Sequence, residues 1–313
     1  MFAYIVRRIL ATIPVMAVVA LFVFSLLHLS PGDPAVIIAG DTATLDDIAR
    51  IRAKLGLDQA FYIQFGTWVW GLLHGDLGIS IFTNLPVSTL IAQRIEPTAA
   101  LTVSTLVVSI LTAIPMGVLA AWKAGSWIDR VVMVFAVLGF SVPVFVLAYL
   151  LIYFFAIYTD LLPVQGFVSI RHGLGPFLAH IAMPSLALGM VYAALIARMT
   201  RASMLDVLAQ DYIRTAQAKG LSNDKVLIGH ALKNAAVPIV TIIGIGVALL
   251  ISGVVVTETV FAIPGLGRLT VDAILRRDYP IIQGIILIFS AAYVLINLFV
   301  DLSYTLFDPR IRY

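Results

Sequence analysis

The residues of this 313-residue chain that are best suited to chemistry lie in one polar stretch, Asp206–Pro238, between two long apolar runs. Its sequence is DVLAQDYIRTAQAKGLSNDKVLIGHALKNAAVP. The guanidinium of Arg214 and the ammonium of Lys219 can pair with carboxylates on another protein. The small side chain of Ala216 would let a helix seat closely in a partner groove. Docking is therefore one interpretation of this polar stretch. The spacing by itself favours the alternative, a solvated connecting loop with incidental helicity, since helix-break-helix is a common connector.

Sequence motifs for catalysis are absent from the chain. It has no G-x-x-x-x-G-K-[ST] phosphate loop, no H-E-x-x-H zinc motif and no G-x-S-x-G nucleophile motif. It contains no cysteine, which excludes disulfides and cysteine-ligated metals. The histidines show no metal-ligand spacing and are His28, His74, His172, His180 and His230. We therefore predict a protein that is not an enzyme and that binds no cofactor or metal.

The polar stretch is predicted to form two short helices with a break between them. Four residues recur at spacings of 3, 4 and 4, which predicts one helical face. These residues are Leu205, Leu208, Tyr212 and Ala216. Gly220 can adopt the left-handed backbone that ends a helix, and Leu221 would complete the hydrophobic contact of that stop. Candidate N-cap side chains for the second helix follow at Ser222, Asn223 and Asp224.

The overall composition predicts that most of the chain is surrounded by lipid. Hydrophobic residues make up 61% of it and charged residues 12%, whereas soluble domains carry roughly 25% charged residues. With so few charges the chain cannot cover itself with polar surface, and its mean hydropathy is +1.04. The net charge of +3 is too small to indicate nucleic acid as a partner.

Six apolar segments are long enough to cross a membrane as helices. The predicted spans are 9–30, 98–122, 131–158, 181–197, 235–257 and 279–306. Between them we expect an extracytoplasmic subdomain at 31–97, the polar stretch at 206–234 and an extracytoplasmic loop at 258–278. We expect the first span to be an uncleaved helix, because its uncharged run exceeds the roughly 7–15 residues of a signal-peptide core. Pro115, Pro143 and Pro184 lie inside spans, where each removes a helix hydrogen bond and can introduce a kink.

The distribution of Lys and Arg predicts that both termini are cytoplasmic. Twelve of the 20 cationic residues fall in segments on one side of the membrane, at more than twice the density of the other side. Positive residues concentrate in cytoplasmic loops. The polar stretch 206–234 would then also face the cytoplasm.

Two carboxylates, Glu258 and Asp301, stand at the ends of the last two predicted spans. An ionisable group inside a membrane is by default a candidate functional group. Because both residues lie at span edges, we expect them to snorkel toward water or to cap a helix.

The segment YIRTAQAKGLSNDKVLIGHALKNAAVPIV resembles the EAA-loop signature of ABC-importer permeases. The matching positions are Thr215, Ala216, Gly220, Ala236 and Pro238. Arg214, Thr215 and Ala216 replace Glu-Ala-Ala, which resembles the dipeptide, oligopeptide, nickel and glutathione branch. Segments similar to that branch extend over nearly the whole chain: LSPGDPA at 29–35, LGLDQ at 55–59, GDLGIS at 75–80, PGLGRL at 264–269, RDYPIIQ at 277–283 and DPRIRY at 308–313.

This resemblance implies an all-α integral membrane protein with a MetI-like permease bundle of six helices, in the bacterial inner membrane. It also implies a homologous second permease as heterodimer partner, two cytoplasmic ATPase subunits that bind ATP and magnesium, and an extracytoplasmic substrate-binding protein. The chain itself would bind no cofactor. The residues expected to couple to the ATPases are Tyr212, Arg214, Thr215, Ala216, Lys219, Gly220, Leu221 and Pro238.

The cargo that the resemblance implies is a dipeptide or short oligopeptide, with nickel complexes or glutathione as the alternative. A secondary transporter driven by an ion gradient is a competing class. It would favour ionisable residues at mid-membrane, and the uncharged spans count against it. A membrane-embedded enzyme would need polar catalytic groups clustered within the spans, and the sequence contains no such cluster.

Overall fold

The computed structural model describes residues 2–29, 35–36, 44–54 and 56–307. Over these residues the chain is almost entirely helical, and its β pairing is limited to one isolated antiparallel bridge between Ile79 and Pro86. Helices suit a lipid environment because each one satisfies its backbone N–H and C=O groups within a single segment. The all-α fold class predicted from the sequence is confirmed.

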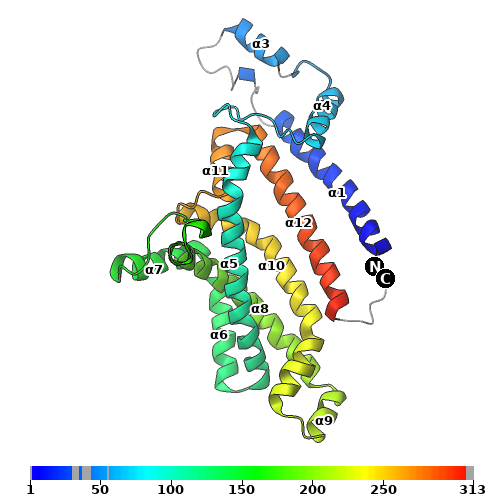
Figure 1. Ribbon diagram of the computed structural model, residues 1–313, viewed down its shortest axis with the longest axis vertical. Coiled ribbons are helices and arrows are strands. Elements are labelled where there is room, and N and C mark those ends of the chain that lie inside the picture. Colours follow the sequence, from blue (N-terminus) through cyan, green and yellow to red (C-terminus); the bar gives the residue numbers. More distant parts are fainter. Residues whose placement is uncertain (1, 30–34, 37–43, 55, 308–313) are drawn as a thin grey trace. The chain divides into compact units, whose positions relative to one another are not determined.

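The helices can be followed in chain order in Figure 1. The long helices are α1 (Phe2–Leu29), α5 (Val87–Trp122), α8 (Leu174–Leu208), α10 (Lys233–Val260) and α12 (Tyr279–Phe307). The shorter ones are α3 (Leu45–Lys54), α4 (Phe61–Leu73), α6 (Trp127–Ser141), α7 (Val144–Leu151), α9 (Asp211–Ala218) and α11 (Leu266–Arg276). The remaining helical segments are the π-helical η1 (Ile152–Tyr158) and η3 (Lys225–Leu232), and the 3-10 turn η2 (Ile170–His172).

Five helices in the described part of the chain are long and apolar enough to cross a membrane. They are α1, α5, α8, the continuous helix of η3 and α10, and α12. The helices extend beyond the predicted spans: α5 begins at Val87 instead of residue 98, and α8 runs to Leu208 instead of residue 197. The reason is that a helix ends at a cap or turn residue, whereas an apolar run ends at the first charge.

The helix predicted over 131–158 is instead two helical pieces bent by 103°. Between them Val142 has an extended backbone, with φ −86 and ψ 123. A residue before proline is pushed out of the helical region, and Pro143 has no N–H with which to continue the helix. Pro115 and Pro184, by contrast, lie within the unbroken helices α5 and α8. If the bent pair counts as one span, it is the sixth in the described part of the chain.

Some sequence predictions fall on residues outside those that the structure describes. They are residue 30 of the first span, most of LSPGDPA at 29–35, residue 55 of LGLDQ, the corresponding parts of the subdomain 31–97, and DPRIRY at 308–313.

The chain divides into two compact units, and the first comprises residues 1–95 and 269–294. In it, the ring of Phe24 on α1 lies 5.4 Å from the ring of Phe61 on α4 and 5.2 Å from that of Trp68, measured between centroids. The buried carboxylate of Asp278, just before α12, accepts a 2.6 Å hydrogen bond from the Ser80 hydroxyl. These contacts fix α4 and the loop before α5 onto the helices of this unit.

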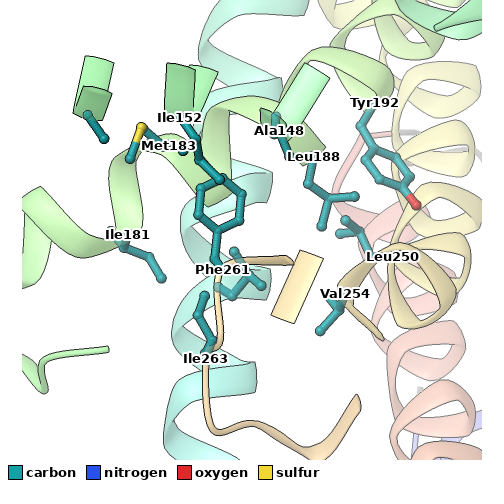
Figure 2. Close-up of a cluster of buried hydrophobic side chains, with 13 residues drawn as sticks. Ala148, Ile152, Ile181, Met183, Leu188, Tyr192, Leu250, Val254, Phe261 and Ile263 are labelled. Carbon is teal, nitrogen blue, oxygen red and sulfur yellow. The ribbon is translucent and has the colours of Figure 1, made fainter. Parts of the chain in front are cut away.

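The second unit comprises residues 96–268 and 295–313, and its main apolar core surrounds α8. Helices α6, α7 and α10 all pack against α8. Figure 2 shows part of this core, in which side chains of α8 and α10 meet two residues of the loop after α10. These two, Phe261 and Ile263, are 1% and 0% exposed.

Close packing in this unit requires glycine at two helix crossings. A Cβ atom added to Gly117 of α5 would lie 2.7 Å from the backbone oxygen of Ala197 on α8. A Cβ atom added to Gly139 of α6 would lie 2.9 Å from the Cβ of Ala194, which is also on α8. Small residues allow helix backbones to approach in membranes, where packing replaces the hydrophobic effect as the attraction between helices.

We expect Gly117→Ala to destabilise the permease, because the added methyl group must push α5 away from the backbone of α8. Overpacking of this kind costs roughly 1–3 kcal/mol. Gly175→Ala is the matched control, since Gly175 also lies in a helix and has no atom within 4 Å of an added Cβ. Thermal unfolding of the detergent-solubilised protein measures the effect. Equal unfolding temperatures for the two variants would contradict this account of the crossing.

Candidate coupling site

The polar stretch is folded onto the helices of its own unit. After a break at residues 209–210, α9 places the side chain of Ile213, which is 1% exposed, into a buried apolar cluster. In that cluster it joins Met204 of α8 and Val226 and Leu227 of η3. Burial of apolar surface stabilises such a contact by roughly 25 cal/mol per Å². The stretch is therefore an anchored element of the bundle and not a loose connecting loop.

The helical face predicted through four residues of this stretch is wrong. Leu205 and Leu208 belong to the end of α8, whereas Tyr212 and Ala216 belong to α9. The break between the two helices resets the register, so that Ile213 takes the buried position and Tyr212 is 44% exposed. Ile213 and Ala216 have the i, i+3 spacing that would have indicated this face.

Ala216 contacts the protein's own cluster, contrary to the expectation that it faces a partner. Its side chain is half-buried on the same side of α9 as Ile213. A small residue here lets α9 lie close to the bundle.

Gly220 ends α9 as the sequence predicted, with φ +79. Its N–H donates to the carbonyl of Gln217 at 2.9 Å, and the N–H of Leu221 donates to the carbonyl of Ala216 at 3.3 Å. This pair of hydrogen bonds defines a Schellman motif, in which the residue after the glycine makes an apolar contact. Leu221 makes that contact by packing against the same cluster as Ile213.

The second helix of the stretch is not a separate short helix. Its π-helical turns continue without a break into α10, since Leu232 and Lys233 both have helical backbone angles. Asp224 is already helical and its side chain makes no capping hydrogen bond. Pro238 lies inside α10, half-buried, and not at the entry of the helix. A displacement of this stretch would therefore be carried directly into α10.

The exposed side of α9 carries the polar candidates. Arg214 and Asp211 form an i, i+3 pair at 3.5 Å with side chains 74% and 96% exposed. Such a pair contributes little to stability, so Arg214 remains able to bind a carboxylate on another protein. The Thr215 hydroxyl donates to the Asp211 carbonyl at 3.0 Å, and Lys219 is exposed at the C-cap. Partial burial raises the pKa of the Tyr212 phenol, which keeps it a neutral donor.

A buried ion pair braces the helices beside this site, and sequence reasoning missed it. The Asp129 carboxylate, in a residue 4% exposed, accepts hydrogen bonds from Arg201 Nε at 2.5 Å and Nη2 at 2.8 Å. It also accepts the N–H of Gly125 at 2.9 Å. This bidentate geometry fixes the turn between α5 and α6 to α8. The available signal was Ser126 followed three residues later by Asp129, a spacing typical of a helix start.

The site as a whole offers exposed cations and hydroxyl groups on a helix that Ile213 anchors to the bundle. Among the described residues, no three potential metal ligands lie close enough together to hold a metal ion.

The chain belongs to the family of inner membrane components of binding-protein-dependent transport systems. The model of that family matches residues 113–313, and the model of the family's N-terminal part matches residues 1–104. The family recognised from the sequence is thereby confirmed: this is a multi-pass inner membrane permease subunit of an ABC importer and not an enzyme.

Individual relatives match along their whole length. A probable peptide ABC transporter permease of Sinorhizobium fredii is 55% identical over 310 residues, with 99% of each chain covered. A putative peptide transport system permease of Brucella abortus is 45% identical over 313 residues, with 100% of each chain covered. A glutathione transport system permease of Salmonella choleraesuis is 44% identical over 313 residues, with 100% of each chain covered.

Proposed function

We propose that this chain forms half of the translocation pathway of an ATP-driven importer of dipeptides or short oligopeptides. The observation that carries the proposal is the full-length similarity, at 55% and 45% identity, to two permeases named for peptide transport. A homologous second permease as heterodimer partner, two cytoplasmic ATPase subunits that bind ATP and magnesium, and an extracytoplasmic binding protein would complete the transporter.

Glutathione is a second candidate cargo, favoured by the full-length similarity to a glutathione permease at 44% identity. Glutathione is itself a tripeptide. Its amide and carboxylate groups would need a polar pathway across the bilayer, as those of any short peptide do. Nickel complexes remain the alternative that rests on the sequence resemblance alone.

The exposed side of α9, with the glycine stop that follows it, is the proposed ATPase-docking surface. Arg214 and Lys219 would pair with acidic groups of the ATPase, and Tyr212 and Thr215 would supply hydrogen bonds. Two observations support this assignment: these four side chains are exposed, and Ile213 anchors their helix to the bundle. Closure of the ATPases would then shift α9 and, through η3, the whole of α10. Rocking of the bundle by such a shift is one route to alternating access.

We expect Gly220→Val to weaken ATPase retention while leaving the amount of permease in the membrane nearly normal. The substitution meets no neighbouring atom, since an added Cβ has open space, but the positive φ costs a non-glycine residue roughly 1–2 kcal/mol. This strain falls on the proposed docking surface. Co-purification of the ATPase subunits, set against permease content by immunoblot, measures the outcome.

Gly229→Val is the matched control for that experiment. Gly229 also has open space around an added Cβ and lies in η3, but its φ is not positive. It should retain the ATPases as the unmodified protein does. Wild-type retention and transport by Gly220→Val would refute the docking role, and so would loss of that variant from the membrane.

We also expect a cysteine at Ser222 to face the cytoplasm and one at Gln165 to face the opposite side. The chain has no cysteine of its own, so single cysteines report cleanly, and both positions are exposed. A membrane-impermeant maleimide applied to intact cells should label Gln165→Cys and spare Ser222→Cys until the cells are permeabilised. The opposite labelling pattern would invert the proposed orientation.

Deletion of this permease should abolish growth on a dipeptide that supplies a required amino acid, while the free amino acid still supports growth. The physical reason is that a charged dipeptide cannot cross the bilayer without a pathway. Growth assays and uptake of a radiolabelled dipeptide measure the loss, and expression of the permease from a plasmid should restore both. Unchanged dipeptide uptake with loss of glutathione uptake would assign the second candidate cargo.

A further inference from the structure

Glu258, in the last turn of α10, has a fully buried side chain. Its Oε1 accepts a 2.5 Å hydrogen bond from the hydroxyl of Thr98 on α5. Its Oε2 accepts a 2.9 Å hydrogen bond from the backbone N–H of Arg268 in α11. Of the two expectations for this carboxylate, snorkelling toward water is wrong and helix capping is confirmed, because Glu258 accepts a backbone N–H of the first turn of α11. A buried carboxylate is held in place only where such donors compensate for lost hydration.

The Thr98 hydroxyl extends this contact to a second backbone group. The N–H of Leu266, the first residue of α11, donates to Thr98 Oγ1 at 2.7 Å. The hydroxyl thus accepts from the loop and donates to the carboxylate. Through one carboxylate and one hydroxyl, the end of α10 is joined to α5 and to the start of α11, all within the second unit.

The glycines of the PGLGRL segment make room for this carboxylate. An ideal Cβ on Gly265 would lie 2.1 Å from Oε1 of Glu258, and one on Gly267 would lie 2.9 Å from Oε2. Neither distance is compatible with a side chain at the glycine. The loop therefore fits closely around the carboxylate. This contact explains why both positions are occupied by glycine, since any side chain there would collide with Glu258.

The same loop inserts two apolar side chains into the core of the unit. Phe261 and Ile263 lie among residues of α8 and α10 in Figure 2, and both are buried. The Phe261 carbonyl also accepts the N–H of Gly166 at 2.9 Å. A loop held by the carboxylate of Glu258 thus closes this end of the apolar core.

We propose that Glu258 is a positioning residue of the transport cycle, which locks the loop 261–268 and α5 to the end of α10. The inference rests on the proposed function, because it takes the α9 surface as the point where ATPase motion enters. Helix α10 has 28 residues and spans about 42 Å. The docking element joins one end of α10 and the Glu258 lock holds the other. A shift of α10 then moves the loop with it and exposes the core that Phe261 and Ile263 close.

The Thr98 hydroxyl allows the lock to be weakened without a substitution in the loop or at Glu258, since the bond from the Arg268 N–H to Glu258 remains. Thr98→Val keeps the shape of the side chain but removes the group that bonds both Leu266 and Glu258. Thr98→Ser keeps the hydroxyl. If Thr98 served only to fill space, Thr98→Val would behave as the unmodified protein does. If its hydroxyl holds the loop, Thr98→Ser would do so instead.

The test measures maleimide reactivity of Ile263→Cys in the assembled transporter in permeabilised membranes, without nucleotide and with ATP plus vanadate. With Thr98 or Thr98→Ser, we expect slow labelling without nucleotide and a rise of several-fold with ATP and vanadate. With Thr98→Val, labelling without nucleotide should be about tenfold faster, as expected for the loss of a buried hydrogen bond. Its rise with ATP and vanadate should be smaller, because only the Arg268 N–H then ties the loop to Glu258.

Ile196→Cys is the control for general loosening, since Ile196 of α8 is equally buried but lies outside the docking helix and the lock. Its labelling should be the same in all three Thr98 backgrounds. The proposal is overturned if Thr98→Val leaves the labelling of Ile263→Cys slow, if it accelerates Ile196→Cys equally, or if serine behaves as valine does. It is also overturned if the nucleotide response in Thr98→Val is as large as in the unmodified protein. A transporter that imports no dipeptide would refute the proposed cargo without changing any of these labelling rates.

Discussion

The close approach of α5 and α6 to α8 is the contact on which the second unit depends. Between helices in lipid there is no hydrophobic driving force, so association relies on close van der Waals packing and hydrogen bonds. Gly117 and Gly139 permit that packing, because a Cβ at either position would overlap with α8. The Asp129–Arg201 pair then fixes the turn between α5 and α6 against the same helix. The apolar cluster beneath α9 includes residues of α5 and α8, so it depends on this arrangement.

The two ends of α10 are held by different interactions, apolar packing at its start and hydrogen bonds to a carboxylate at its end. At its start, apolar side chains hold α9 and η3 on the bundle, while polar groups of α9 stay exposed. At its end, a buried carboxylate organises a glycine-containing loop through hydrogen bonds. Apolar contacts tolerate sliding, whereas a carboxylate in a fitted set of donors has one good geometry. The proposed input end is therefore the adaptable one and the proposed lock is the specific one.

The break at Pro143 changes the direction of the helical segment 127–158. A proline within an apolar run is compatible with a continuous helix, as Pro115 and Pro184 demonstrate. At Pro143 the preceding residue has an extended backbone, and the two helical pieces are bent by 103°. The proline permits both outcomes, and the packing of α6 and α7 on α8 distinguishes them.

The sequence by itself determined the all-helical membrane class, the family and the helix stop at Gly220. Each follows from local information: the scarcity of charge, motifs along the chain, and a residue type that tolerates positive φ. Tertiary structure alone decided that Ile213 replaces Tyr212 on the buried face and that Asp129 meets Arg201, 72 residues away. It also decided that Glu258 is buried against Thr98, at a separation of 160 residues. The physical reason is that periodicity and composition report a residue's own environment, whereas hydrogen-bond partners distant in sequence are set by how the helices pack.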